Sequence, residues 1–128
     1  MNEDYISFEV AKLAKEAGFN WMVGSAYYKN ERIDQYYGYQ NQGEEYYSRC
    51  SQAVLLKWIR ERFDLLVRMY FDEDTLKFES CHSLINFKTG FQSGMLEERK
   101  EFNSFEEAVE ESLKNTLRFI LKQNIHLK

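Results

Sequence analysis

The stretch SQAVLLKWIRERFDLLVRMYF, at residues 51–71, decides the fold that this sequence predicts. Its first part, 51–63, carries apolar residues at the three- and four-residue spacing of an amphipathic helix, with Trp58 at the edge of the apolar stripe. Ser51 is placed to cap this helix, because a serine side chain accepts hydrogen bonds from the first backbone N–H groups. We therefore expect one helix that runs directly into one strand.

The second part of the stretch, 65–71, predicts that strand, because its residues alternate between a clearly apolar set and a mixed set. The apolar face would carry Leu65, Val67, Met69 and Phe71. The acidic run at 72–75 predicts a turn, and alternation resumes on a returning arm from Leu76. Residues 84–87 either continue that arm or begin a third strand.

A helix is also predicted near the N-terminus, at residues 7–17. Ser7 is placed as its cap, and Gly18 as the residue that ends it in the left-handed conformation. Phe19 would then fold back onto Ala14, the hydrophobic contact that often accompanies such a helix end.

The C-terminal helix is predicted to begin at Ser104, where Ser-Phe-Glu-Glu forms a capping box with Glu107. A broad apolar stripe carries this helix to about Lys122. Its first half is crowded with acids that we expect on the exposed face: Glu106, Glu107, Glu110 and Glu111. The preceding segment, 88–103, is expected to be a loop.

Most of the nine tyrosines fall between residues 20 and 47. Aromatic richness favours strands over helices. We expect one strand at 21–29 and a second at 33–39, joined by a turn at 30–31 and followed by a polar loop at 40–45.

These elements predict a single α+β domain over residues 1–128, made of a small antiparallel sheet with three helices packed mainly on one face. The tyrosine-rich segment 27–47 would be a hairpin within the domain or an insertion in it. A chain of 128 residues buries enough surface to form one core.

Composition excludes several classes of protein. The hydrophobic content of 44% is ordinary for a globular domain and argues against disorder. No apolar run approaches the roughly 18 residues that a membrane span needs, and the acidic N-terminus does not resemble a signal peptide. We expect a cytoplasmic protein with no membrane partner, in which Cys50 and Cys81 are reduced.

No set of residues matches a catalytic, metal or cofactor motif, and we expect no cofactor and no metal. Cys81 and His82 would point to opposite faces of a strand, and Cys50 precedes a helix that could lower its thiol pKa. A buried structural cysteine is the favoured interpretation of both thiols. His126 is the other histidine, too little for a metal cluster, and the acids at 72–74 lack the calcium-loop pattern. An enzyme with an unrecognised site is the weakest alternative.

The tyrosine-rich segment carries the leading functional hypothesis, because tyrosine is enriched at binding surfaces. Each tyrosine doublet on a strand must place one ring on each face of the sheet. We expect a non-enzymatic interaction module that forms a homodimer or binds another protein. Its binding residues would be Tyr27, Tyr28, Tyr36, Tyr37 and Tyr39. The competing interpretation is that alternate tyrosines fill the core face of the sheet while the others are half-exposed.

The alternative function is a nucleic-acid-binding accessory protein. The net charge of −4 disfavours a general nucleic-acid binder, but basic residues concentrate at 49–68. Phosphate contacts would come from Lys57, Arg60, Arg62 and Arg68. Tyrosines would stack on the bases. The acidic segment 97–111 could instead pair with this basic one.

Three motifs of the chain are typical of a group of small uncharacterised proteins from bacterial phage-type and mobile elements. They are ISFEVAKLAKEAGF at 6–19, QxxLxxWxRE at 52–61 and FxSFEEAxExxL at 102–113. The chain resembles this group at its two ends and its middle, but not in the segment 27–47. The motifs are a cap, a stripe and a tryptophan, so the resemblance implies an accessory or host-interaction role and carries over no catalytic residue.

Overall fold

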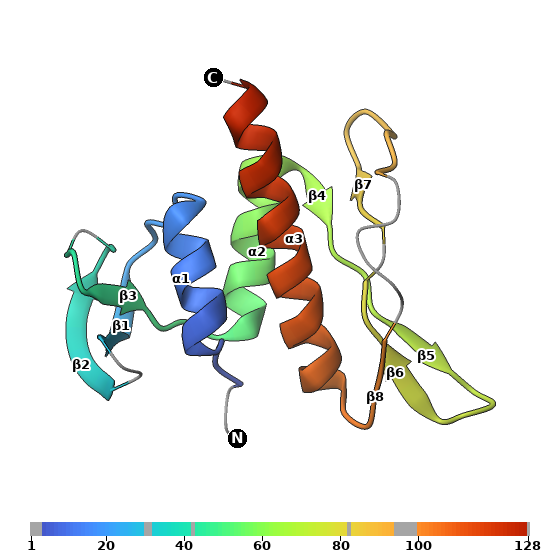
Figure 1. Ribbon diagram of the computed structural model, residues 1–128, viewed down its shortest axis with the longest axis horizontal. Coiled ribbons are helices and arrows are strands. Elements are labelled where there is room, and N and C mark those ends of the chain that lie inside the picture. Colours follow the sequence, from blue (N-terminus) through green and yellow to red (C-terminus); the bar gives the residue numbers. More distant parts are fainter. Residues whose placement is uncertain (1–3, 30–31, 42, 82, 94–99, 128) are drawn as a thin grey trace.

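The computed structural model describes residues 4–29, 32–41, 43–81, 83–93 and 100–127, with the side chains of 36, 37 and 124–127 left aside. It confirms the α+β class: three helices and several short antiparallel strands make up the described chain. The helices are α1 (Phe8–Glu16), α2 (Gln52–Phe63) and α3 (Phe105–Leu127). In Figure 1 they lie side by side, and the strands flank them on two sides. The strands therefore form several small sheets instead of one.

The first sheet is the tyrosine-rich one, with the strand order β2-β1-β3, all antiparallel. Its strands are β1 (Val23–Tyr28), β2 (Arg32–Tyr39) and β3 (Tyr46–Ser48). The two strands expected from the sequence are confirmed, and β3 was not predicted. The predicted turn at 30–31 lies outside the described residues. The register shifts between Val23, which pairs with Tyr39, and Ser25, which pairs with Gln35. Gly38 absorbs this bulge with a φ of +68°.

The single strand predicted at 65–71 is wrong. The chain there forms β4 (Leu65–Leu66) and β5 (Tyr70–Asp72), which belong to different sheets. All the side chains from 65 to 70 are half-buried, so no single face is apolar, and Phe71 is 49% exposed. Alternation predicted one apolar face because a sequence pattern does not say which strand each segment pairs with. Here the partner changes between the two short strands.

The partners of these strands are β7 (Ile85–Asn86) for β4, and β6 (Lys77–Glu79) for β5. The strand β8 (Glu101–Phe102) pairs with β6 and completes a sheet of order β5-β6-β8. The acidic turn after β5 is confirmed, since Asp72 Oδ1 accepts a 2.9 Å hydrogen bond from the backbone N–H of Asp74. The segment 88–103 is mostly without regular structure where it is described, apart from the unpredicted β8.

Helix α1 begins and ends as the sequence predicts. Ser7 Oγ accepts a hydrogen bond from the backbone N–H of Val10 at 3.2 Å. At the other end, Gly18 has a φ of +100°, and Phe19 N–H donates to the carbonyl of Ala14 at 2.9 Å. This is a Schellman end, which glycine permits because it has no Cβ. It turns the Phe19 ring into the core, where it is 1% exposed.

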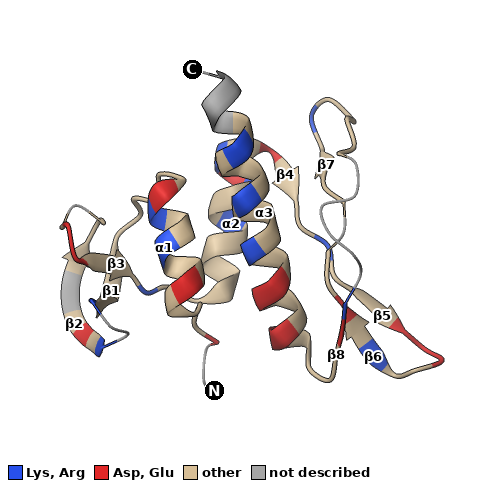
Figure 2. Cartoon of the chain, in the orientation of Figure 1, with Lys and Arg blue, Asp and Glu red and all other residues tan. Residues whose placement is uncertain are grey.

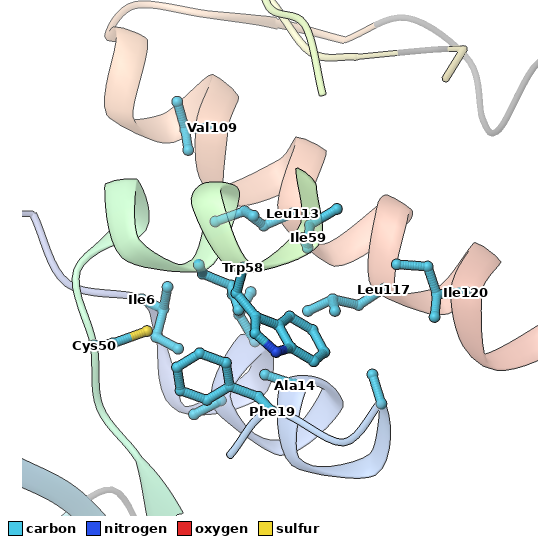
Figure 3. Packing of buried hydrophobic residues seen from close by; sticks show 14 of the residues in the cluster. Ile6, Ala14, Phe19, Cys50, Trp58, Ile59, Val109, Leu113, Leu117 and Ile120 are labelled. Carbon is cyan, nitrogen blue, oxygen red and sulfur yellow. The ribbon is translucent and has the colours of Figure 1, made fainter. Parts of the chain in front are cut away.

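Helix α2 is capped by Ser51, whose Oγ accepts from the backbone N–H of Val54 at 3.2 Å. Trp58 was expected at the edge of the apolar stripe but is 2% exposed and central. Its ring meets those of Phe19 and Phe63 edge-on, each at 5.3 Å between centroids. Figure 3 shows Trp58 between Phe19 and the α3 side chain Leu117. The indole thus joins the three helices into one core.

Helix α3 begins where the capping box predicts. Ser104 Oγ accepts from the backbone N–H of Glu107 at 3.2 Å and donates to the Glu107 carboxylate at 3.0 Å. The helix runs to Leu127, beyond the predicted end near Lys122. Acidic residues occupy its first turns and basic residues its later turns in Figure 2, which suits the helix dipole.

One of the acids of α3 joins the three helices, although all were expected to be exposed. The backbone N–H of Ser7 donates to both carboxylate oxygens of Glu110, each at 3.2 Å. Gln52 Nε2 donates to the carbonyl of Glu106 at 3.0 Å and reaches Glu110 Oε1 at 3.4 Å. The positive end of the α1 dipole also stabilises this carboxylate, because the carboxylate lies beside the first turn of that helix.

Candidate interaction surface on the tyrosine-rich sheet

Tyr27 and Tyr39 belong to the core and are unavailable to a partner. Tyr27 is 9% exposed, meets the Phe8 ring edge-on at 5.7 Å, and donates its hydroxyl to the carbonyl of Ile6 at 2.5 Å. Tyr39 is 3% exposed and donates to the carbonyl of Tyr46 at 2.8 Å. Both hydroxyls are satisfied by backbone, as buried tyrosines require. Their assignment to a binding surface is therefore corrected.

Tyr28 lies on the other face of β1, as the alternation of a strand requires. It pairs across the sheet with Tyr46, and the two rings stack with centroids 4.6 Å apart. Two cations lie over the Tyr28 ring, Lys29 Nζ at 5.2 Å and Arg32 Cζ at 4.6 Å from its centroid. These four residues, Tyr28, Lys29, Arg32 and Tyr46, are called the Tyr28 cluster below.

Each cation of the Tyr28 cluster also contacts a carboxylate. Lys29 Nζ lies 3.5 Å from Glu45, and Arg32 lies 3.1 Å from Asp34. The pKa of Lys29 is raised, first by its hydrogen bond with the Tyr28 side chain and then by the charge of Glu45. The surface around Tyr28 therefore carries charges of both signs. Lys29, Arg32 and Tyr46 were not among the predicted binding residues, because the stack exists only once β1 and β3 are paired.

The Tyr28 cluster rests on an anchored loop. Lys15 on α1 donates to the carbonyls of Gly43 and, at 2.7 Å, of Tyr46. Burial lowers the pKa of Lys15, partly offset by Glu44. Asn41 donates to the carbonyl of Phe19 at 2.8 Å and accepts from the backbone N–H of Ser48 at 2.9 Å. The Tyr46 ring is thereby held in place for stacking.

The other predicted binding residues are not brought to the Tyr28 cluster. Tyr36 and Tyr37 lie in β2, and their side chains are outside the described ones. Lys57, Arg60 and Arg62 are exposed on α2. Lys57 pairs with Glu61 at 3.8 Å, and the Arg62 guanidinium lies over the neighbouring Phe63 ring at 5.3 Å. No contact between described side chains joins these three basic residues to the cluster.

The two thiols are buried and free of each other. Burial raises the pKa of Cys50 to about 12, and it also raises that of Cys81, whose Sγ contacts the carbonyl of Ser83 at 3.0 Å. The position of Cys50 before α2 does not lower its thiol pKa, because desolvation outweighs any effect of the helix end. His82 and the side chain of His126 lie outside what the structure describes.

Three carboxylates meet on the sheet β5-β6-β8. Oxygens of Asp72, Glu79 and Glu101 lie within 4.8 Å of one another. Oxygen ligands of this kind suit a hard cation such as Ca²⁺. Asp72 was predicted only as part of the turn with its sequence neighbours. The group was not predicted, because Glu79 and Glu101 meet through strand register.

No protein-family model, no curated protein and no solved structure matches the chain. Among the described helices, none is long and apolar enough to cross a membrane.

Proposed function

We propose that this protein is a non-enzymatic interaction module that self-associates through the Tyr28 cluster. The observation that carries this proposal is the half-exposed Tyr28–Tyr46 stack with Lys29 and Arg32 over its ring. Tyrosine and arginine are the residue types that most often dominate protein interfaces, since they offer a large, stiff surface with a polar end.

A second copy of the chain is the partner that the charges favour. The cations Lys29 and Arg32 are 51% and 64% exposed at their side chains, and Glu45 and Asp34 lie beside them. In a twofold interface each surface patch faces itself, so a patch with both signs of charge can be complementary to its own copy. Cations of one copy would then meet Glu45 and Asp34 of the other across the stacked rings.

Sedimentation velocity at increasing protein concentration tests this proposal. We expect the wild-type protein to move from monomer toward dimer, and the Tyr28→Ala variant to remain monomeric. Tyr70→Ala is the matched control, because Tyr70 is a half-buried tyrosine with Arg68 over its ring at 5.7 Å, but in the other sheet. A wild-type protein that stays monomeric, or a Tyr28→Ala variant that dimerises as tightly, would contradict the proposal.

The nucleic-acid alternative has no specific geometry in its favour. Tyr27 and Tyr39 are buried, so neither ring can stack on a base, and the contacts between described side chains do not bring Lys57 to the half-exposed tyrosines. Titration of single-stranded DNA at low salt tests it, since phosphate contacts weaken steeply as salt rises. The resemblance to phage-type proteins supports an accessory role for an interaction module, and we place the protein in the cytoplasm, where both thiols stay reduced.

A further inference from the structure

A polar cavity of about 280 Å³ lies where the tyrosine-rich sheet meets the start of α2. Ser25 of β1 and Gln35 of β2 line it on one side, and Ser51 at the cap of α2 lines it on the other. Arg49 is the one residue with a formal charge among the described residues that line this cavity. The cavity is on the face of the sheet opposite to Tyr28, because Ser25 and Tyr28 are an odd number of positions apart on β1.

The Arg49 guanidinium is held in place but is not neutralised. It lies 3.8 Å from the centroid of the Tyr5 ring, and its Nη1 donates to Ser25 Oγ at 3.3 Å. Its Nε is buried without a hydrogen-bond partner. No carboxylate in the described part of the chain pairs with Arg49, whereas Lys29, Arg32, Lys57 and Arg118 each have one. An arginine has five N–H donors, and in the described part of the chain the guanidinium donates to Ser25 Oγ alone.

The remaining lining does not supply the missing negative charge. Cys50 lines the cavity, but burial raises its thiol pKa to about 12, which keeps it neutral at physiological pH. The other described residues that line the cavity are apolar or uncharged, among them Met22, Val23 and Val54. A half-buried cation without a counter-charge is unfavourable, so an anion that enters this space gains more than it would at an exposed arginine.

We propose that this cavity binds a small monocarboxylic acid, with its carboxylate on the Arg49 guanidinium and its apolar body against Met22, Val23 and Val54. A planar carboxylate matches the fork of a guanidinium that a ring already holds flat. A single cation balances a single negative charge, which favours a carboxylate over a phosphate dianion. The polar rim of Gln35 and Ser51 offers further donors to the second carboxylate oxygen.

Titration of the ¹⁵N-labelled protein with sodium benzoate, followed by NMR, tests this proposal directly. We expect the amide signals of Gly24, Ser25 and Ser51 to shift in a saturable way. Two further probes identify the chemistry that is recognised: benzamide has the same body without the charge, and inorganic phosphate has the charge without the body. We expect benzamide to bind about tenfold more weakly or worse, because it lacks the charge-assisted hydrogen bonds.

Substitutions locate the binding at Arg49. Arg49→Gln is expected to abolish the shifts, and Arg49→Lys, which keeps the charge but loses the fork, to weaken binding about tenfold. Arg118→Gln is the matched control, since Arg118 is on α3 and pairs with Glu9 at 3.2 Å. If Arg49→Gln does not fold, the lysine variant and the wild-type titration still decide.

Four results would overturn the proposal. They are the absence of saturable shifts with benzoate, equal affinity for benzamide, tighter binding of phosphate than of benzoate, and an unchanged affinity for benzoate in Arg49→Lys or in a folded Arg49→Gln. None of them depends on self-association through the Tyr28 cluster, so this proposal and the dimer proposal fail separately.

Discussion

The two three-stranded sheets of this protein are attached to the helices in different ways. In the sheet β2-β1-β3, Ala26, Tyr27 and Tyr39 are buried, and Tyr27 belongs to the hydrophobic core that the helices share. In the sheet β5-β6-β8 no described side chain is fully buried, and Phe71 is 49% exposed. This second sheet contacts the helices through the ring of Phe78, which lies 5.8 Å from the ring of Phe105 on α3, measured between centroids.

The difference shows that the first sheet is part of the core, while the second is held at its margin. A polar contact attaches the second sheet to α3: just after β6, the backbone N–H of Cys81 donates to Ser112 Oγ at 2.7 Å. Side-chain burial stabilises the first sheet, and individual polar contacts stabilise the second. Four substitutions test this distinction, and each can be followed by urea unfolding.

Tyr27→Ala should have the largest effect, because it empties a buried site next to Phe8. We expect a loss of about 3 kcal/mol or more in the free energy of unfolding. Phe71→Ala is the control in the second sheet and should lose about 1 kcal/mol, since its ring is half in water. Equal losses in the two variants would mean that the sheets are equally integrated and would break the comparison.

Ser112→Ala should come next. Ser112 Oγ accepts from Cys81 N–H and donates to the carbonyl of Ala108 at 2.7 Å, and the residue is fully buried. Its removal leaves the buried N–H of Cys81 unpaired, at an expected cost of about 1–3 kcal/mol. Hydrogen exchange should show faster exchange of the Cys81 amide, with the amides of β1 unaffected. A variant as stable as the wild type would show that the second sheet is held by other contacts.

Tyr27→Phe isolates the hydroxyl in the first sheet. The ring contact with Phe8 is kept, and only the hydrogen bond to the carbonyl of Ile6 is lost. We expect a loss of about 1–2 kcal/mol. A loss as large as that of Tyr27→Ala would show that the hydrogen bond, not burial of the ring, attaches this sheet to the core.

Glu111→Gln should have the smallest effect, and its effect should depend on pH. Burial alone would raise the pKa of Glu111, but Lys114 at 2.9 Å and Lys100 at 3.5 Å outweigh it and lower that pKa. A lowered pKa stabilises the folded protein above the unfolded-state value of about 4.3. That stability is lost as the pH falls through the folded-state pKa. We expect a loss below about 1 kcal/mol at neutral pH, because the lysines are partly exposed.

The pH series decides this last prediction. The difference in unfolding free energy between wild type and Glu111→Gln should shrink steadily as the pH is lowered past the usual range for glutamate. Lys122→Gln is a control that removes a charge without touching Glu111. A difference that stays constant at acid pH would mean that Glu111 acts through shape and not through charge.

Sequence was most informative where the determinants are local. Ser7, Gly18, Ser51 and Ser104 mark helix ends through contacts within a few residues, and all four boundaries are confirmed. The rule that a tyrosine doublet splits between two faces is also confirmed at Tyr27 and Tyr28, but the sequence does not say which face is covered.

Features that depend on distant partners were missed. The strand at 65–71 divides because its two ends pair with different strands, and β8 consists of two residues that only its pairing with β6 defines. The sequence likewise could not predict that Arg49 has no carboxylate partner among the described residues, because this depends on where the acidic side chains lie in the folded chain. The Tyr28 cluster needed the pairing of β1 with β3 for the same reason.

The contact between Ser7 and Glu110 has a consequence for how the chain folds. These residues are 103 positions apart in sequence, and they join the first helix to the last. Closing so long a loop is entropically costly and slows folding. During synthesis, the apolar faces of α1 and α2 therefore lack their final cover until α3 has left the ribosome. Folding of this core is completed only when α3 is available, and nascent chains that stop before α3 expose apolar surface that chaperones recognise.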